Sequence, residues 1–76
     1  MRMELTAVFQ EAPEGGYVAF VPEIPGAASQ GETLDEAREN LEDAVRLLME
    51  SRRERFEREH AGQPLIRQPL LIDETA

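Results

Sequence analysis

A single long helix, predicted over residues 33–59, constrains this 76-residue chain more than any other feature. Thr33 can accept a hydrogen bond from the first helical turn, and Glu36 can reach back from three residues on, so the two form a capping box. Apolar residues at three- and four-residue spacing then predict one buried face. These residues are Leu34, Ala37, Leu41, Ala44, Val45 and Leu48. Gly62 and Pro64 end the helix.

The apolar stripe stops near Glu50, although the helix is predicted to continue. Beyond that point only Phe56 offers a large apolar contact on the same face. Opposite charges four residues apart favour continued helix. The pairs are Arg53 with Glu57, Glu54 with Arg58, and Arg55 with Glu59. The helix would span roughly 39 Å, about twice an ordinary strand. We therefore expect its first half to lie on a sheet and its second half to extend beyond the sheet.

A β-hairpin is predicted over residues 3–21. Apolar and polar residues alternate over residues 3–11, residues 13–16 have the composition of a turn, and residues 17–21 form the second strand. That second strand is apolar on both faces, and such strands are usually covered on both faces. One helix covers only one face. We therefore expect a homodimer or homotetramer in which Val18 and Phe20 form the contact, with Phe56 as a further interface residue.

Two prolines take residues 22–26 out of the sheet, and residues 27–30 are predicted as a third strand of small residues. After the helix, either Leu65 and Ile66 or residues 70–72 are expected to form a last strand at a sheet edge. Residues 73–76 are predicted to be a frayed tail. The expected fold is α+β, in the order β-β-β-α-β, with one long helix across one face of an antiparallel sheet.

The composition excludes several classes of function. The absence of cysteine rules out disulfides and thiolate-bound zinc. Sixteen acidic and eight basic residues give a net charge of −8, which argues against direct binding to nucleic acid. The charge indicates either a basic partner or simply a surface that keeps the protein in solution. Neither a signal peptide nor a membrane-spanning run is recognisable, so we expect a cytoplasmic protein with no membrane association.

Catalytic chemistry is not predicted. His60 is the only histidine, and a catalytic triad or a histidine metal site needs partners that the chain does not offer. The carboxylates are spread over a strand and the outer helix face, and the Gly15–Gly16 pair joins strand to strand and not strand to helix, so it is no phosphate loop. We expect no catalytic residue, no cofactor and no metal, and hence no enzyme.

Residues 15–46 carry four linked motifs. They are G-Y-V-A-F-V-P-E-I-P-G at residues 16–26, S-Q-G-E-T at 29–33, L-D-E-A at 34–37 and N-L-E-D-A at 40–44. This set resembles the HicB antitoxin family, whose members share a pattern close to G-Y-x-A-x-x-P-E-[LI]-P-G, then a run ending in S-Q-G-[DE]-T, then a helix that opens L-x-E-A and continues N-[LI]-x-[ED]-A. Ala27 stands where the family usually has a cysteine or a larger residue.

The resemblance implies a partial RNase H-like fold, assembly into dimers or tetramers, and neutralisation of HicA, a small basic RNA-cleaving toxin. The chain departs from the family in one respect: many members carry a C-terminal DNA-binding domain, and here only sixteen residues follow His60. We therefore expect a single HicB-like domain over residues 1–76, without autoregulation by DNA binding. The partner-binding residues are expected on the acidic helix face or in the loop at residues 22–26. They are Glu23, Asp35, Glu39, Glu42 and Asp43. The alternatives are a solitary regulatory or nucleic-acid-binding domain without a toxin partner, and a nuclease by fold analogy alone.

Overall fold

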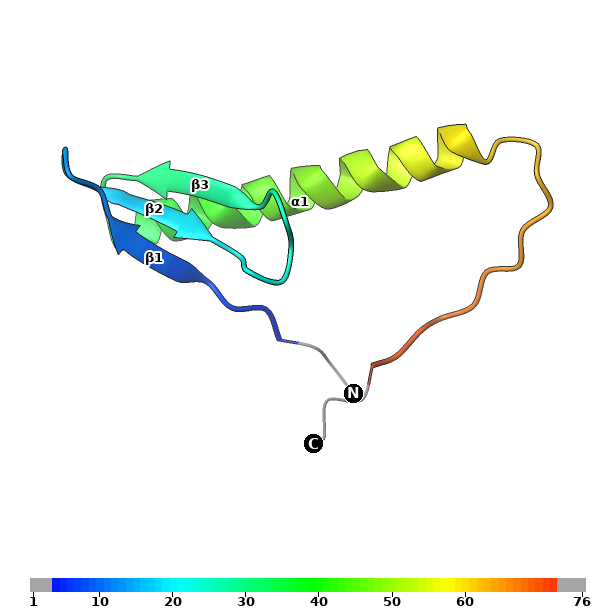
Figure 1. Ribbon diagram of the computed structural model, residues 1–76, viewed down its shortest axis with the longest axis horizontal. Coiled ribbons are helices and arrows are strands. Elements are labelled where there is room, and N and C mark those ends of the chain that lie inside the picture. The colour runs from blue at the N-terminus through cyan, green and yellow to red at the C-terminus, as the bar shows by residue number, and fades with distance from the viewer. Residues whose placement is uncertain (1–3, 73–76) are drawn as a thin grey trace.

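The computed structural model describes residues 4–72 and shows an α+β fold (Figure 1). Three short strands, β1 (Val8–Glu11), β2 (Tyr17–Phe20) and β3 (Ala28–Gly31), precede one long helix, α1 (Leu34–Glu59). The strands form an antiparallel sheet in the order β1-β2-β3. The helix lies across one face of this sheet, and its C-terminal half extends past the sheet as the sequence predicted.

The helix begins with the predicted cap. Thr33 has an extended backbone, and its Oγ1 accepts a hydrogen bond of 3.0 Å from the backbone N–H of Glu36. The reciprocal bond differs by one residue from an ideal capping box, because the Glu36 carboxylate accepts from the N–H of Glu32 at 3.1 Å. Both bonds satisfy donors that the helix itself cannot pair, which fixes where the helix starts.

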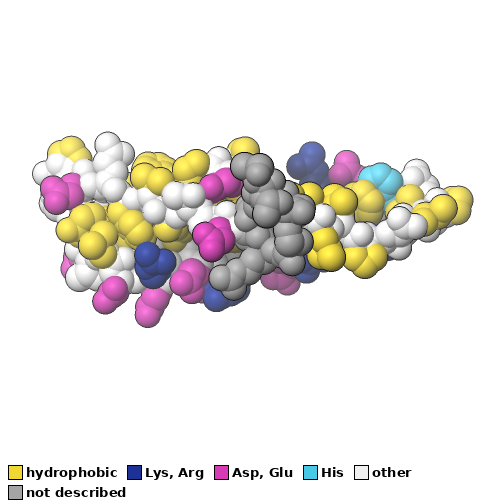
Figure 2. All heavy atoms as spheres, turned by 90° about the horizontal axis from the view of Figure 1, so that it is seen from below, with side chains coloured by type: hydrophobic (Ala, Val, Ile, Leu, Met, Phe, Trp, Pro, Cys, Tyr) yellow, Lys and Arg dark blue, Asp and Glu magenta, His cyan; other side chains and the backbone are white. Residues whose placement is uncertain are grey.

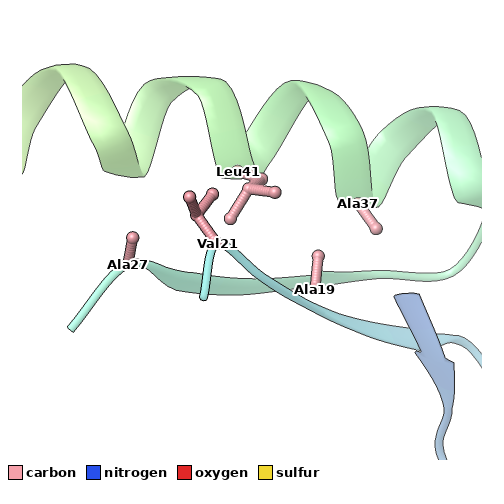
Figure 3. Packing of buried hydrophobic residues seen from close by; sticks show 5 residues of the cluster. All are labelled: Ala19, Val21, Ala27, Ala37 and Leu41. Carbon is pink, nitrogen blue, oxygen red and sulfur yellow. The ribbon is translucent and has the colours of Figure 1, made fainter. Parts of the chain in front are cut away.

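The core lies between the sheet and the first half of α1. Its five buried residues are Ala19, Val21, Ala27, Ala37 and Leu41 (Figure 3). Partly buried residues such as Phe9 and Leu48 pack around this cluster. Ala19 and Val21 point to the helix, which leaves Val18 and Phe20 on the opposite face of the sheet. Three of the five core residues are alanines, so the core is small even for a domain of this size.

Small residues let the two layers approach closely. A Cβ atom added to Gly31, at the end of β3, would lie 2.5 Å from the backbone nitrogen of Ala37. Ala37 itself is fully buried in the first turns of α1. The Asn40 amide strengthens the same junction by donating to the Gln30 carbonyl oxygen at 2.8 Å. This end of the helix is therefore held against β3 by packing and by a hydrogen bond.

The extended half of α1 is held by different contacts. Arg52 donates to the Pro25 carbonyl oxygen at 2.8 Å, at the point where the helix leaves the sheet. Farther along, the rings of Phe56 and His60 stack with centroids 4.1 Å apart. Of the three predicted charge pairs, only Arg55–Glu59 forms within the described residues, at 3.5 Å.

The charged partner of Glu57 comes from the segment that follows the helix. Arg67 pairs with the Glu57 carboxylate at 3.0 Å and lies over the Phe56 ring. Gly62, with φ +79°, supplies the left-handed conformation after the helix end. Within residues 4–72, no helix is both long enough and apolar enough to cross a membrane.

The strand predictions require two corrections. The first strand is shorter than residues 3–11, because residues 4–7 lie outside the ladder and Met3 lies outside the described residues. The backbone N–H of Thr6 bonds to the Glu23 carboxylate instead of to a neighbouring strand. The predicted last strand does not form, since residues 63–72 contain no strand. That segment leaves the helix well beyond the sheet, and Pro64 and Pro69 each remove a ladder donor. The predicted frayed tail at residues 73–76 lies outside the described residues.

Candidate protein-binding surfaces

Four predicted partner-binding residues lie on the outer face of α1. Asp35, Glu39, Glu42 and Asp43 are all exposed. Glu42 and Asp43 pair with Arg46 at 3.5 and 2.9 Å, whereas Asp35 and Glu39 have no ion pair among the described residues. Figure 2 shows acidic side chains gathered along the sheet-bearing half of the molecule. The face therefore keeps a negative charge that one arginine only partly offsets.

Glu23, the fifth predicted residue, occupies a different place. Its two carboxylate oxygens accept from the backbone N–H of Thr6 at 3.1 Å and from the Thr6 hydroxyl at 2.7 Å. The hydroxyl bond and then the amide bond of Thr6 lower the pKa of the Glu23 carboxyl. Glu23 thus joins the loop at residues 22–26 to the segment before β1.

The outer face of the sheet has one apolar row and one mixed row of side chains, and no element among the described residues covers it. The register places Val8, Phe20 and Ala28 side by side across the three strands, and Gln10, Val18 and Gln30 in the next row. Val18 and Phe20 are half-buried, and Val8 is exposed. Cross-strand neighbours of this kind form a continuous patch. Phe56, the third predicted interface residue, lies far from this patch on the extended half of α1, between His60 and Arg67.

The surface has two notable hollows near the sheet. An apolar groove of about 290 Å³ runs between α1 and the segment before β1, and Leu5, Val21, Leu41 and Val45 are among its lining residues. A polar hollow of about 400 Å³ lies at the other end, where Gly16, Gln30, Glu32 and Asn40 meet. Within residues 4–72, no group of three or more histidine, aspartate or glutamate side chains is placed to hold a metal ion.

Two contacts that shape these surfaces were not predicted from the sequence. The Thr6–Glu23 pair joins residues 17 positions apart, and the Arg52–Pro25 bond joins residues 27 positions apart. Arg52 did carry a signal, since it lies on the continuation of the apolar helix face, where a charged residue is unexpected. Thr6 carried none, because threonine is common in strands.

The architecture defines a class of small α+β modules in which a sheet carries one long helix on a single face and the remaining surfaces are open to partners. The family model of the HicB-like antitoxin of bacterial toxin–antitoxin systems matches residues 6–68. The chain belongs to this family. The match covers the sheet and the whole of α1, so it includes the acidic helix face and the outer face of the sheet.

Several curated relatives, all named UPF0150 proteins, are similar to the chain. One from Synechocystis sp. is 48% identical over 58 residues, which is 76% of this chain and 81% of the relative. A second Synechocystis protein is 41% identical over 46 residues, covering 60% of this chain and 58% of the relative. A protein from Thermoplasma acidophilum is 39% identical over 49 residues, covering 64% and 71%. No solved structure matches the chain significantly.

Proposed function

We propose that this chain is a non-catalytic antitoxin module that neutralises a small, basic, RNA-cleaving toxin of the HicA type by binding it. Membership in an antitoxin family supports a toxin partner. The observation that carries the proposal is the acidic outer face of α1, where Asp35 and Glu39 are exposed and have no ion pair among the described residues. A basic RNase surface complements this charge, which speeds association and makes it depend on salt.

The test is a charge reversal on the helix face. In the Asp35→Lys, Glu39→Lys double variant, affinity for a HicA-type toxin should fall by about a hundredfold or more, and the salt dependence should weaken. The Glu11→Lys, Glu14→Lys variant is the matched control, because it changes the net charge by the same amount at exposed positions away from the helix. Glu11 ends β1, and Glu14 lies in the turn between β1 and β2.

The control separates local docking from long-range steering. If both variants lose affinity equally, only the overall charge matters and the helix face is not the docking surface. If the helix variant binds as the unmutated chain does, the toxin docks elsewhere, for example beside Glu23. If no HicA-type toxin binds the unmutated chain in any salt, the antitoxin proposal is wrong.

We further propose that the chain forms a homodimer or homotetramer through the outer face of the sheet. Val8, Phe20 and Ala28 form one cross-strand row on this face, and no element among residues 4–72 covers it. The Phe20 and Val18 side chains supply the apolar contact, and burying the area that they still expose contributes about 25 cal/mol per Å².

Light scattering tests this assembly. Phe20→Asp should lower the average mass toward that of one chain at micromolar concentration, because it places a charge within the patch. Leu47→Asp is the control, since Leu47 is 66% exposed on the helix and away from the patch. Val8→Lys, at an exposed position of the same row, guards against unfolding by Phe20→Asp. A folded monomer of the unmutated chain, or equal effects of Leu47→Asp and Val8→Lys, would refute the sheet-face contact.

A further inference from the structure

The apolar groove is a preformed site beside an open sheet edge. It lies between α1 and residues 5–7, which lead into β1, and β1 is an edge strand of the described sheet. Thr6, in the wall of the groove, is fixed by two hydrogen bonds to Glu23. The volume of about 290 Å³ is nearly twice the roughly 150 Å³ of an engineered cavity that binds benzene. The groove is therefore large enough for two aliphatic side chains.

The segment after the helix carries aliphatic side chains that its own chain leaves in solvent. Ile66, Leu70 and Leu71 are 91%, 83% and 76% exposed. Isolated exposed leucines are ordinary, but three in six residues form an apolar segment that normally marks a binding site. The apolar pattern of these residues also led to the prediction of a last strand. Such a pattern is typical of a segment that packs against other residues and is not left in solvent.

The segment falls short of the groove of its own chain. Arg67 is anchored to Glu57 and lies over Phe56. None of residues 65–72 lines the groove, and Leu70 and Leu71 both lie in solvent. In the structure, therefore, the segment does not fill the groove of its own chain.

Charge favours the same segment as the occupant of a groove in another copy. Arg38, Glu42 and Arg46 all line the groove, and the Glu42 carboxylate pairs with Arg46 at 3.5 Å. Arg46 is already paired with two carboxylates, whereas Arg38 contacts the Phe9 ring and has no carboxylate partner among the described residues. In the sequence, the acidic pair Asp73–Glu74 directly follows the apolar run. An apolar segment that ends in acidic residues complements an apolar groove that is lined by an unpaired arginine.

We propose that residues 65–72 of one copy bind in the apolar groove of a second copy, with Leu70 and Leu71 as the side chains that fill it. Each copy has one groove and one such segment, so two copies can exchange their segments and close a two-fold dimer. The groove borders the acidic helix face at Glu42, but it includes neither Asp35 nor Glu39 nor the outer face of the sheet. The charge reversal at Asp35 and Glu39 and the test of this contact therefore address different residues.

Disulfide cross-linking tests the contact directly, because the natural chain has no cysteine. Leu5→Cys and a tagged Leu71→Cys chain are mixed and oxidised, and the mixed disulfide is measured on a non-reducing gel. Leu5 and Leu71 are 48% and 76% exposed, so both variants should remain folded. The control mixture replaces Leu5→Cys with Leu47→Cys, which is at least as exposed but lies outside the groove.

The expected result is at least about tenfold more mixed disulfide for Leu5→Cys than for Leu47→Cys, because binding raises the effective thiol concentration. Equal yields from the two mixtures would overturn the proposal. A Leu5→Cys, Leu71→Cys chain that closes its disulfide within one molecule in dilute solution would also overturn it, since the segment would then occupy its own groove. Neither measurement involves a toxin.

Discussion

The two halves of α1 obtain their stability from different sources. Residues 34–48 bury Ala37 and Leu41 against the sheet and pack Val45 and Leu48 around them. Residues 49–59 contain no buried residue and are held by the Arg52–Pro25 bond, the Phe56–His60 stack and a few exposed ion pairs. Surface ion pairs contribute about 0–1 kcal/mol, far less than a buried leucine. The two halves of one continuous helix therefore differ in stability. A partner that covers the extended half would bury side chains that the fold of the single chain leaves exposed.

The largest expected effect separates the halves by packing. Leu41→Ala should lower the free energy of unfolding by about 2–5 kcal/mol, because Leu41 is 3% exposed and its truncation leaves a cavity in a core of five residues. Leu47→Ala, at a 66% exposed position on the same helix, should change it by less than about 0.5 kcal/mol. Urea denaturation measures both. Similar losses of unfolding free energy in the two variants would contradict the proposed difference between the buried and exposed faces of the helix.

Amide hydrogen exchange compares the halves without any mutation. Residues 50–59 should exchange at least about tenfold faster than residues 41–48, a difference of about 1.4 kcal/mol in opening free energy. The exposed half can fray without loss of core contacts. Equal protection in a dilute sample would contradict this expectation, whereas protection that appears only at high protein concentration would place the second half in an interface.

The N-cap gives a smaller effect in the sheet-backed half. Thr33→Ala should cost about 1 kcal/mol, because it removes the acceptor for the Glu36 backbone N–H. The midpoint of chemical denaturation measures the loss, and Thr33→Ser, which keeps the hydroxyl, should restore most of it. If Thr33→Ala leaves the midpoint unchanged, the 3.0 Å bond contributes nothing to stability.

The smallest effect concerns pH and the Glu23 clamp. The Thr6 hydroxyl, and then the Thr6 amide, hold the pKa of Glu23 below its ordinary value of 4.5. The unfolded chain therefore takes up this proton at a higher pH than the folded chain does. The stability that the clamp adds is fully present above about pH 4.5 and is lost as the pH falls through the lowered pKa. Glu23→Gln should flatten the acid side of the stability profile, whereas Glu14→Gln should not.

Local signals made most of the fold predictable. The helix, its cap at Thr33 and its end follow from neighbours within a few residues, and the structure reproduces all three. Residues 17–21 do not alternate between apolar and polar, and only the two-residue period of a strand places Ala19 and Val21 on one face and Val18 and Phe20 on the other. The last strand was predicted wrongly because apolar runs such as residues 70–72 show that a segment needs cover but do not show where that cover comes from.

The surfaces were less predictable than the fold. The sequence placed Asp35, Glu39, Glu42 and Asp43 on one face, and helical geometry alone guarantees that result. It gave no sign that Glu23 would bond to Thr6, because that contact depends on how a loop closes over a strand. Long-range hydrogen bonds of this kind leave no periodic trace in a sequence. Docking roles for all five residues remain predictions.

The close approach of Gly31 to Ala37 limits how this protein can evolve. Because a methyl group at residue 31 would collide with the helix backbone, and because Ala19 and Ala37 are fully buried beside it, larger side chains cannot enter between the layers without separating them. Selection for greater stability therefore has little room inside the domain. Substitutions that strengthen the protein must accumulate on its outside, where they also alter which molecules it recognises, so stability and partner choice are expected to change together in this lineage.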